Sequence, residues 1–338
     1  MAVVGHWASL AEAQKLVNSP ILRGVMQTTI EEGGILARLP TYQITGKNIT
    51  YNRESTLVTA GKYDIHEQIP WTASVDYTQR TSTLYRYASA RLIDKFLVQT
   101  YKDPNDLKAI AYKEVAKGFV RTLEDALWYA DETYGVKEFD GLHAFAEEGT
   151  GDNDIDQGDA ALSLMDLRRA IDAVRGPGGR VIVVGREIGR RFDQLVQEAG
   201  VAGGDTNTRR MVNGISFTTD QLGQRVMAFD GIPIVRSDYL VAETNATGQG
   251  SDARAKWTTG TKYYSLFVLR VAPLEDGGIS VCYGGEESPG TLYRVEEFDK
   301  LENYDAGGLR LVSYVGLAVG SPQSIARISD ITDAAIVV

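Results

Sequence analysis

Cysteine and histidine are scarce in this chain, and their scarcity excludes several kinds of site. Among 338 residues there is one cysteine, Cys282, and there are three histidines, His6, His66 and His143. One cysteine cannot form an intramolecular disulfide, and the histidines have no partner at metal-ligand spacing. We therefore expect a protein of a reducing compartment that holds neither a metal nor another cofactor, with His66 as a surface histidine.

Targeting and membrane-spanning segments are also absent from the pattern. Residues 1–7 lack the basic region and the apolar core of a signal peptide. The apolar run 266–274 is interrupted by Arg270 and is too short to cross a bilayer. No membrane partner is expected.

Positive charge is in deficit, and the motifs of common enzymes are missing. The chain carries 45 acidic and 35 basic residues, a formal net charge of −10. Gripping nucleic acid requires a basic surface, so sequence-specific binding is not expected, although an acidic shell can still enclose DNA. The turn 176–179 precedes its strand, as a phosphate loop does not, and neither a Gly-Lys-Ser/Thr nor a Gly-x-Ser-x-Gly motif occurs. The sequence predicts no enzyme.

The first forty residues predict a short helix followed by an arm. Residues 8–18 have a helical composition that ends before Pro20. The stretch 20–40 is rich in glycine and threonine and has only scattered apolar residues. An arm without a core of its own must lie on the body or on a neighbouring molecule.

Residues 44–78 predict a long β-hairpin with its turn at 59–62. From 63 to 77 most odd positions are apolar and the even ones are mostly polar, the period-2 pattern of a strand with one buried face. Two strands alone are only marginally stable in water, so this face needs a partner. Its apolar side chains are candidates for contacts between subunits, namely Tyr63, Ile65, Ile69, Trp71 and Val75.

Residues 103–130 predict one long helix. Asp103 suits the N-cap and Pro104 the first helical position. Apolar residues then recur every four positions, as a row that slants around the helix and can pack diagonally on a sheet. This row consists of Leu107, Ala111, Val115, Phe119, Leu123 and Leu127.

A second lobe follows the acidic, glycine-rich loop 147–159. Ser163 and Asp166 form a capping box ahead of a helix, and 181–184 and 188–199 predict a strand and a further helix. More strands are expected at 231–235, 264–269, 279–283, 291–298 and 309–319.

No lysine occurs between Lys137 and Lys256, whereas arginine is frequent there. Arginine forms planar, bidentate pairs with carboxylates and suits interfaces better than lysine. We expect this lobe to pack against copies of itself, with Arg190 and Arg191 as contact candidates. Composition bias is the alternative explanation.

The order of these elements resembles the major capsid proteins of tailed bacteriophages, which have the Hong-Kong-97-type fold. The matching stretches are Tyr85–Phe96 before the long helix, 139–142 (Phe-Asp-Gly-Leu) after it, 231–238 (Gly-Ile-Pro-Ile-Val-Arg-Ser-Asp) and 317–322 (Leu-Ala-Val-Gly-Ser-Pro). Together they span nearly the whole chain.

The resemblance implies an α+β chain with defined parts. These are an N-terminal arm (1–43), an extended hairpin or E-loop (44–80), a peripheral domain with the spine helix 103–130 (81–150), an axial domain (151–290) and return strands of the peripheral domain (291–338).

The resemblance also implies a function. The chain is expected to assemble with itself into hexamers and pentamers of an icosahedral virion capsid, formed in the host cytoplasm and enclosing double-stranded DNA. Portal and scaffolding proteins, and a decoration protein, are the implied partners. Some relatives join a hairpin lysine to an asparagine of a neighbour; Lys62 and Asn303 are the corresponding candidates here.

Three other interpretations stay open at this point. An encapsulin, the shell of a cellular nanocompartment, shares the fold. A soluble α/β enzyme built on residues 160–240 would need a catalytic set that the sequence does not offer. A tail or baseplate component is disfavoured by the long helix.

Overall fold

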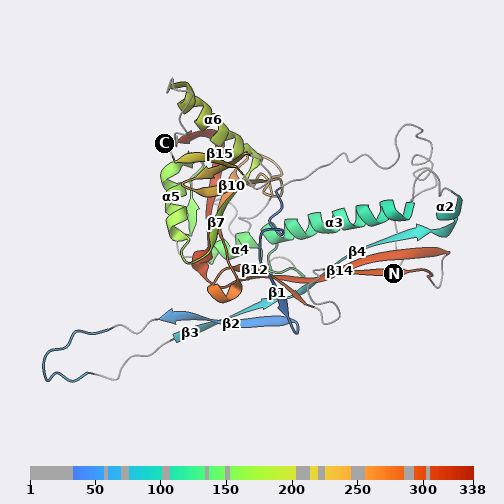
Figure 1. The fold of residues 1–338 in the computed structure, drawn as a ribbon, viewed down its shortest axis with the longest axis horizontal. Helices are drawn as coiled ribbons and strands as arrows, with labels where there is room; N and C mark the ends of the chain where they lie inside the picture. Colours follow the sequence, from blue (N-terminus) through green and yellow to red (C-terminus); the bar gives the residue numbers. More distant parts are fainter. Residues whose placement is uncertain are drawn as a thin grey trace.

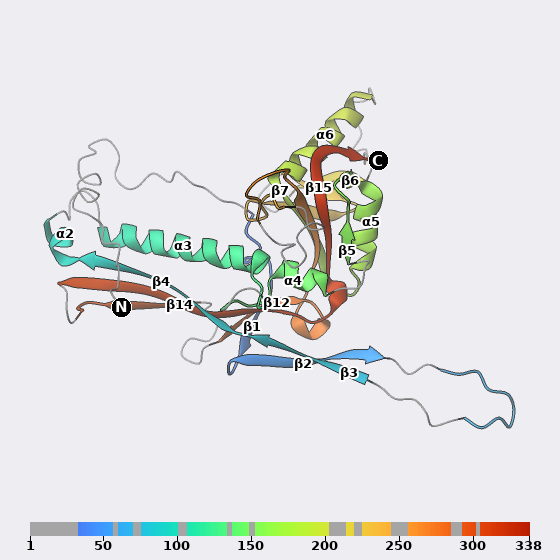
Figure 2. The same cartoon turned by 180° about the vertical axis from the view of Figure 1, so that it is seen from behind.

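The structure is a computed structural model that describes residues 33–56, 60–69, 76–100, 107–133, 137–148, 153–202, 214–219, 225–244, 256–284, 293–301 and 305–338. The predicted helix 8–18, most of the predicted arm, Trp71, Val75 and Asn303 lie outside these ranges. Figures 1 and 2 show an extended molecule: a lobe built on a large sheet, a long helix with long strands beside it, and a hairpin that projects the opposite way.

One sheet has five strands and is organised around a single long strand. Its order is β1 (Thr41–Ile44), β12 (Ile279–Gly284), β14 (Ala306–Val319) and β13 (Arg294–Phe298), with β4 (Tyr85–Asp94) also paired to β14. The β4–β14 pairing is antiparallel and runs from Ala306 opposite Asp94 to Val315 opposite Tyr85. Glycines at 307 and 308 bring β14 close to Phe298.

The long helix α3 (Leu107–Tyr129) lies along this sheet. The sheet, α3 and the two short helices α2 (Lys95–Thr100) and α4 (Leu142–Glu147) together are called the five-stranded lobe. The predicted four-residue row is the buried face: Val115, Phe119, Leu123 and Leu127 pack with β14 residues in one core. The 23 residues of α3 span about 35 Å at the rise of an α-helix. The helix is therefore confirmed over the described part of 103–130.

The second sheet has eight strands and forms the eight-stranded lobe. Its order is β5 (Asp154–Asp156), β15 (Ile325–Val337), β11 (Tyr264–Val271), β7 (Gly179–Gly185), β10 (Ile232–Ser237), β9 (Arg225–Phe229) and β8 (Ile215–Thr219), with β6 (Ala161–Ser163) paired to β15. Helices α5 (Leu164–Ala173) and α6 (Arg186–Ala202) pack on it. Ser163 caps α5 through a hydrogen bond from the Met165 N–H, which confirms the predicted N-cap, while the Asp166 carboxylate accepts from Gln157.

The central strands of this sheet are buried on both faces. Ile182 and Val184 of β7 join the core under α5 and α6, whereas Val183 joins the core that contains α3 and α4. Likewise Val268 and Phe267 of β11 face opposite cores. A strand covered on both sides is apolar at successive positions, which is why 181–184 and 266–269 are continuous apolar runs.

The hairpin consists of β2 (Asn48–Thr56), β3 (Asp76–Thr83) and the loop 60–69 between them. The prediction that a strand begins at 63 is wrong: residues 63–69 form no strand, and a turn lies at 65–66. Asp64 and Glu67 close that turn with hydrogen bonds of their own. The apolar alternation here has no opposing strand among the described residues, and pairing resumes only at Asp76.

Two predicted domain boundaries do not follow the sheets. Strand β12, expected in the axial domain, pairs with β1 and β14 in the five-stranded sheet. Residues 325–337, assigned to the peripheral domain from the sequence, form the final strand β15, which pairs instead with β11, β5 and β6. The chain crosses between its lobes at Gly320–Ser324, directly after β14.

Candidate assembly surfaces

The loop 60–69 carries apolar side chains that its own subunit leaves in solvent. Ile65 is 86% exposed, Ile69 is 64% exposed and Tyr63 is 42% exposed. In Figure 1 the loop lies beyond the ends of β2 and β3, far from either lobe. Of the five predicted contact residues in the hairpin, these three are exposed, while Trp71 and Val75 lie outside the described residues.

Local hydrogen bonds shape the tip of this loop without any core. The Asp64 N–H donates to Glu67 Oε2 at 2.8 Å, and the Glu67 N–H donates to the Asp64 carbonyl at 3.1 Å. His66 adopts a left-handed conformation (φ 71°) between them. This tight turn presents Ile65 outward, and His66 is exposed, as predicted. The apolar side chains of this loop therefore do not pack against their own subunit.

The base of the hairpin, in contrast, is fastened to β14. Tyr51 donates from its hydroxyl to the Val319 carbonyl at 2.8 Å, and Arg53 Nε donates to the Gly320 carbonyl at 3.0 Å. On β3, Ser82 donates to the Leu317 carbonyl at 2.6 Å. Side chains from both strands therefore fix the direction of the hairpin, while its outer part reaches away from the molecule.

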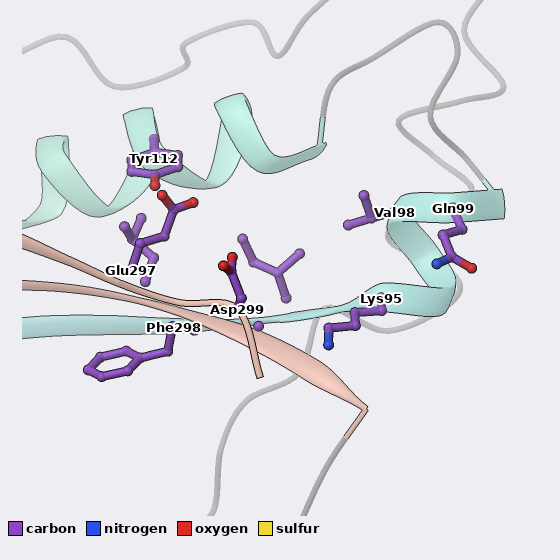
Figure 3. A pocket seen from close by; sticks show the side chains of 11 residues that line it. Lys95, Val98, Gln99, Tyr112, Glu297, Phe298 and Asp299 are labelled. Carbon is purple, nitrogen blue, oxygen red and sulfur yellow. The ribbon is translucent and has the colours of Figure 1, made fainter. Parts of the chain in front are cut away.

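A pocket of about 170 Å³ lies at the far end of the five-stranded lobe, between α2, α3 and the strands β4, β13 and β14. Ile93, Val98 and Leu309 supply apolar lining. Figure 3 shows Tyr112 of α3 and Glu297 of β13 pointing toward one another, while the Phe298 ring points away from α3. The pocket offers room for an aliphatic side chain, with charged groups around it.

Strand β13 borders this pocket and presents further apolar side chains. Val295 and Phe298 are exposed, and so is the preceding Tyr293. The outer edge of β13 pairs with no other described strand. Short length and the charges of Arg294 and Glu296 blunt this edge against unspecific strand pairing.

The two arginines predicted as subunit contacts have different surroundings. Arg190 is 66% exposed over its side chain and lies 3.9 Å from Glu187, one turn away. Arg191 donates to Asp333 Oδ1 at 2.7 Å and to Gln194 Oε1 at 2.8 Å, so its guanidinium is engaged within the subunit. Arg190 keeps its place as a contact candidate; Arg191 joins α6 to the end of β15.

The arginine-rich stretch forms many of its ion pairs inside the eight-stranded lobe. Arg186 pairs with Asp238, and Arg236 with Asp193 at 2.7 Å. These pairs join α6 to β10 and to the turn after it. Part of the arginine excess is therefore used within one subunit, and contact between copies stays a prediction.

A buried polar cluster joins the two lobes. The Glu243 carboxylate accepts from His143 Nε2 at 2.7 Å, from Ser265 Oγ at 2.6 Å and from Arg327 Nη2 at 3.0 Å, and the Tyr129 hydroxyl lies 3.1 Å away. His143, Glu243, Ser265 and Arg327 are almost completely buried. Tyr129 ends α3, His143 belongs to α4, and Ser265 and Arg327 belong to β11 and β15, so the cluster connects the helix to the eight-stranded sheet.

The charges of this cluster compensate one another. Burial alone would raise the pKa of Glu243, but the attraction of His143 and Arg327 outweighs it and holds the pKa at about 2. Burial would lower the pKa of Arg327, yet Glu243 above all raises it. Both ring nitrogens of His143 face oxygens, since Nδ1 lies 2.7 Å from the Trp128 carbonyl. A satisfied network of this kind fixes the geometry of the junction.

Sequence reasoning missed this cluster, because its members are spread from 129 to 327. The signal that was available is polar or charged residues inside apolar stretches: His143 after Gly-Leu, Ser265 at the start of an apolar run and Arg327 between isoleucines. Such residues are almost never fully buried unless they are paired.

The described end of the arm is held by one carboxylate of α3. Glu124 accepts from the N–H groups of Ile35 and Leu36, each at 3.0 Å. Burial raises the pKa of Glu124 in spite of these two hydrogen bonds. Gly34 lies so close that a Cβ atom would stand 2.4 Å from Glu124 Oε1. The arm thus enters the five-stranded lobe at a fixed point before β1.

The described ranges lack two kinds of feature. No helix there has the length and apolar character needed to cross a membrane. No group of three His, Cys, Asp or Glu side chains there is arranged to hold a metal ion.

Comparisons with known proteins place the fold. No protein-family model matches the sequence, and no curated protein matches it. The structure is similar to the SrpI encapsulin of Synechococcus elongatus, with a TM-score of 0.65, 14% identity and 96% of both chains covered. It is also similar to the capsid of a native GTA particle (TM-score 0.58, 12% identity, 96% and 99% covered) and to the capsid of the cyanophage P-SCSP1u (0.57, 14%, 93% and 92%).

The chain therefore has the Hong-Kong-97-type capsid fold, and the predicted α+β class is confirmed. The named neighbours are an encapsulin and capsids, all of them shell structures. Because the match extends over nearly the full length of each chain, the hairpin and both lobes are parts of this fold.

Proposed function

We propose that the chain is a structural shell subunit that assembles into hexamers and pentamers of an icosahedral phage head around double-stranded DNA. Its virion would be assembled in the host cytoplasm. The similarity to shell structures over more than nine-tenths of the chain supports this function. The observation that carries it is the loop 60–69, whose isoleucines are displayed in solvent at the end of a firmly based hairpin.

The physical argument is the removal of apolar surface from water. Full burial of an exposed isoleucine side chain stabilises the contact by about 1.5–3 kcal/mol of free energy. Neither lobe of the same subunit covers Ile65 or Ile69, and a neighbouring copy provides such cover at every symmetry-related position of a closed shell. The pocket lined by Ile93, Val98 and Leu309 is a surface of matching chemistry.

The direct test is assembly of the purified full-length chain. Sedimentation and negative-stain electron microscopy should show capsomers or closed shells of uniform size. Monodisperse monomers at every concentration and salt condition would contradict the function. Co-expression with a portal protein, a scaffolding protein or a decoration protein would then show which partners the shell accepts.

A covalent link between Lys62 and Asn303 of a neighbour also belongs to this proposal. Lys62 is exposed at the start of the loop, so its amine is accessible to a neighbouring copy. Denaturing electrophoresis of assembled particles tests it: a ladder of multimers that disappears in Lys62→Arg supports the link, and a single monomer band excludes it.

An encapsulin-type compartment is a second candidate, favoured by the similarity to the SrpI encapsulin. The contents of purified particles distinguish the two. DNA that resists nuclease until the shell is opened supports a phage head. A co-purifying enzyme inside particles that lack both DNA and a portal supports a compartment.

A further inference from the structure

The eight-stranded lobe contains a cavity of about 520 Å³ beside α5. Its lining includes Met165, Arg168, Arg169, Asp172 and Arg175. The lining thus carries three arginines and one aspartate, with Asp230 next to Arg168, in a chain whose formal net charge is −10. The local charge is opposite to that of the whole molecule.

The cavity is held in shape by the backbone around it. The Arg175 N–H donates to the Gln323 carbonyl at 3.0 Å, and the Arg175 carbonyl accepts from the buried Arg270. Arg175 Nε donates to the Asp172 carbonyl at 3.2 Å, which directs its side chain. Arg168 lies over the Phe229 ring at 5.5 Å and reaches Asp230 at 3.4 Å. These contacts orient the Arg168 and Arg175 side chains in the single subunit.

The residue types around the cavity are those of a protein interface. Arginine and methionine are enriched in interfaces and lysine is depleted. Met165 is 66% exposed on the first turn of α5, and the lining contains three arginines and no lysine. Guanidinium groups pair with carboxylates in a planar, bidentate geometry, so an acidic protein surface fits this site.

The position of α5 indicates which protein brings that surface. In both Figure 1 and Figure 2, α5 forms the side of the eight-stranded lobe toward which the hairpin extends. A copy that covers the loop 60–69 would therefore also face α5. Packing many copies of charge −10 side by side is opposed by their mutual repulsion, and a cationic cavity offsets part of it.

We propose that the cavity lined by Arg168, Arg169 and Arg175 receives carboxylates of the next copy of this chain in the shell. The proposal rests on the proposed shell function and names a contact within it. The contact is heterologous, because the cavity of one copy meets a different patch of its neighbour, as the formation of a ring requires.

A charge-reversal series tests the contact. Changing all three residues, in Arg168→Glu/Arg169→Glu/Arg175→Glu, should raise the protein concentration at which shells appear by about tenfold or more, because each subunit contact loses charge-assisted pairs. The matched lysine series, Arg168→Lys/Arg169→Lys/Arg175→Lys, keeps the charge and should assemble better than the glutamate series. Circular dichroism and thermal melting of the unassembled subunits verify that both variants fold.

A zero-length cross-link provides a positive test. In Arg169→Lys shells, carbodiimide should couple the introduced lysine to a carboxylate of a neighbour, giving a dimer band that wild-type shells lack. Mass spectrometry of that band names the carboxylate. The band should disappear when shells are dissociated before coupling.

The outcomes separate this contact from the proposed function. If the wild-type chain never assembles, the proposed function fails. If wild-type and glutamate-series shells form at the same concentration and no new cross-link appears, the contact is overturned and the shell function stands. If both series form normal shells but the glutamate series alone loses binding to a short DNA duplex, the cavity is a nucleic-acid site and the proposal is overturned.

Discussion

In the eight-stranded lobe, successive residues of β7 and β11 are buried on alternate faces of the sheet. In the hairpin loop, by contrast, every residue from 60 to 69 is exposed. The lobe satisfies even its charges internally, through Glu243 and Arg327. The loop leaves Ile65 and Ile69 in water. The comparison teaches that this chain buries the apolar side chains of one region by itself, whereas those of the other stay exposed in the single subunit; in the proposed shell a neighbouring copy covers them.

The largest effect on the stability of the subunit is expected from a change in the buried polar cluster around Glu243. Glu243→Ala removes the acceptor of His143, Ser265 and Arg327 and leaves buried charge unpaired, which should lower the free energy of unfolding by about 3–5 kcal/mol. Urea denaturation of unassembled subunits measures it. As a matched control, Asp125→Ala removes an exposed pair with Lys256 and should cost at most about 1 kcal/mol. Equal losses in the two variants would show that the cluster is not the lock between the lobes.

The same cluster predicts a pH dependence with a definite sign. The pKa of Glu243 is depressed from 4.5 to about 2 in the folded chain. A depressed carboxyl pKa stabilises the folded state above the ordinary value, and this stabilisation is lost as the pH falls through the folded pKa. The stability difference between wild type and Glu243→Gln should therefore be full above pH 4.5 and shrink toward pH 2. A difference that stays constant across this window would contradict the charge pairing.

A smaller effect is expected at the anchor of the arm. Glu124→Ala leaves the N–H groups of Ile35 and Leu36 without their acceptor, which should cost about 1–3 kcal/mol. Hydrogen exchange at these two amides should accelerate more than exchange in α5. Glu124→Gln keeps one carbonyl acceptor and should lie between wild type and Glu124→Ala. If exchange at 35 and 36 is unchanged, the carboxylate does not hold the arm.

The smallest effect on subunit stability is expected in the hairpin loop. Ile65→Ser/Ile69→Ser changes exposed side chains and should alter the free energy of unfolding by no more than about 0.5 kcal/mol. The same double variant should assemble poorly, because the surface that a neighbour covers is no longer apolar. A variant that melts earlier yet assembles normally would reverse the contrast between the two regions.

Much of this architecture could be predicted from residue patterns within single helices and strands. The four-residue row from Leu107 to Leu127 predicts α3, and the Ser163 cap predicts the start of α5. The stretches 181–184 and 264–269 predict strands, and the structure shows that both are covered on both faces. Each of these signals depends on neighbours within one element, so the sequence alone carries it.

Other features depend on contacts between distant segments, and these were missed or misplaced. Strand β15 was not predicted, because Arg327 and Asp330 interrupt its apolar pattern; both are buried, Arg327 against Glu243. The hairpin strand was placed at 63–77 because alternation there was taken for pairing, whereas β3 begins at Asp76. The polar cluster around Glu243 required the fold itself.

The most direct measurement is the accessibility of position 65 before and after assembly. Cys282 is completely buried, so an Ile65→Cys variant carries one exposed thiol. Maleimide labelling should be fast in unassembled subunits and at least about tenfold slower in shells, because a neighbouring copy covers the loop. Equal labelling rates in subunits and intact shells would show that the loop stays in water, and that other surfaces hold the copies together.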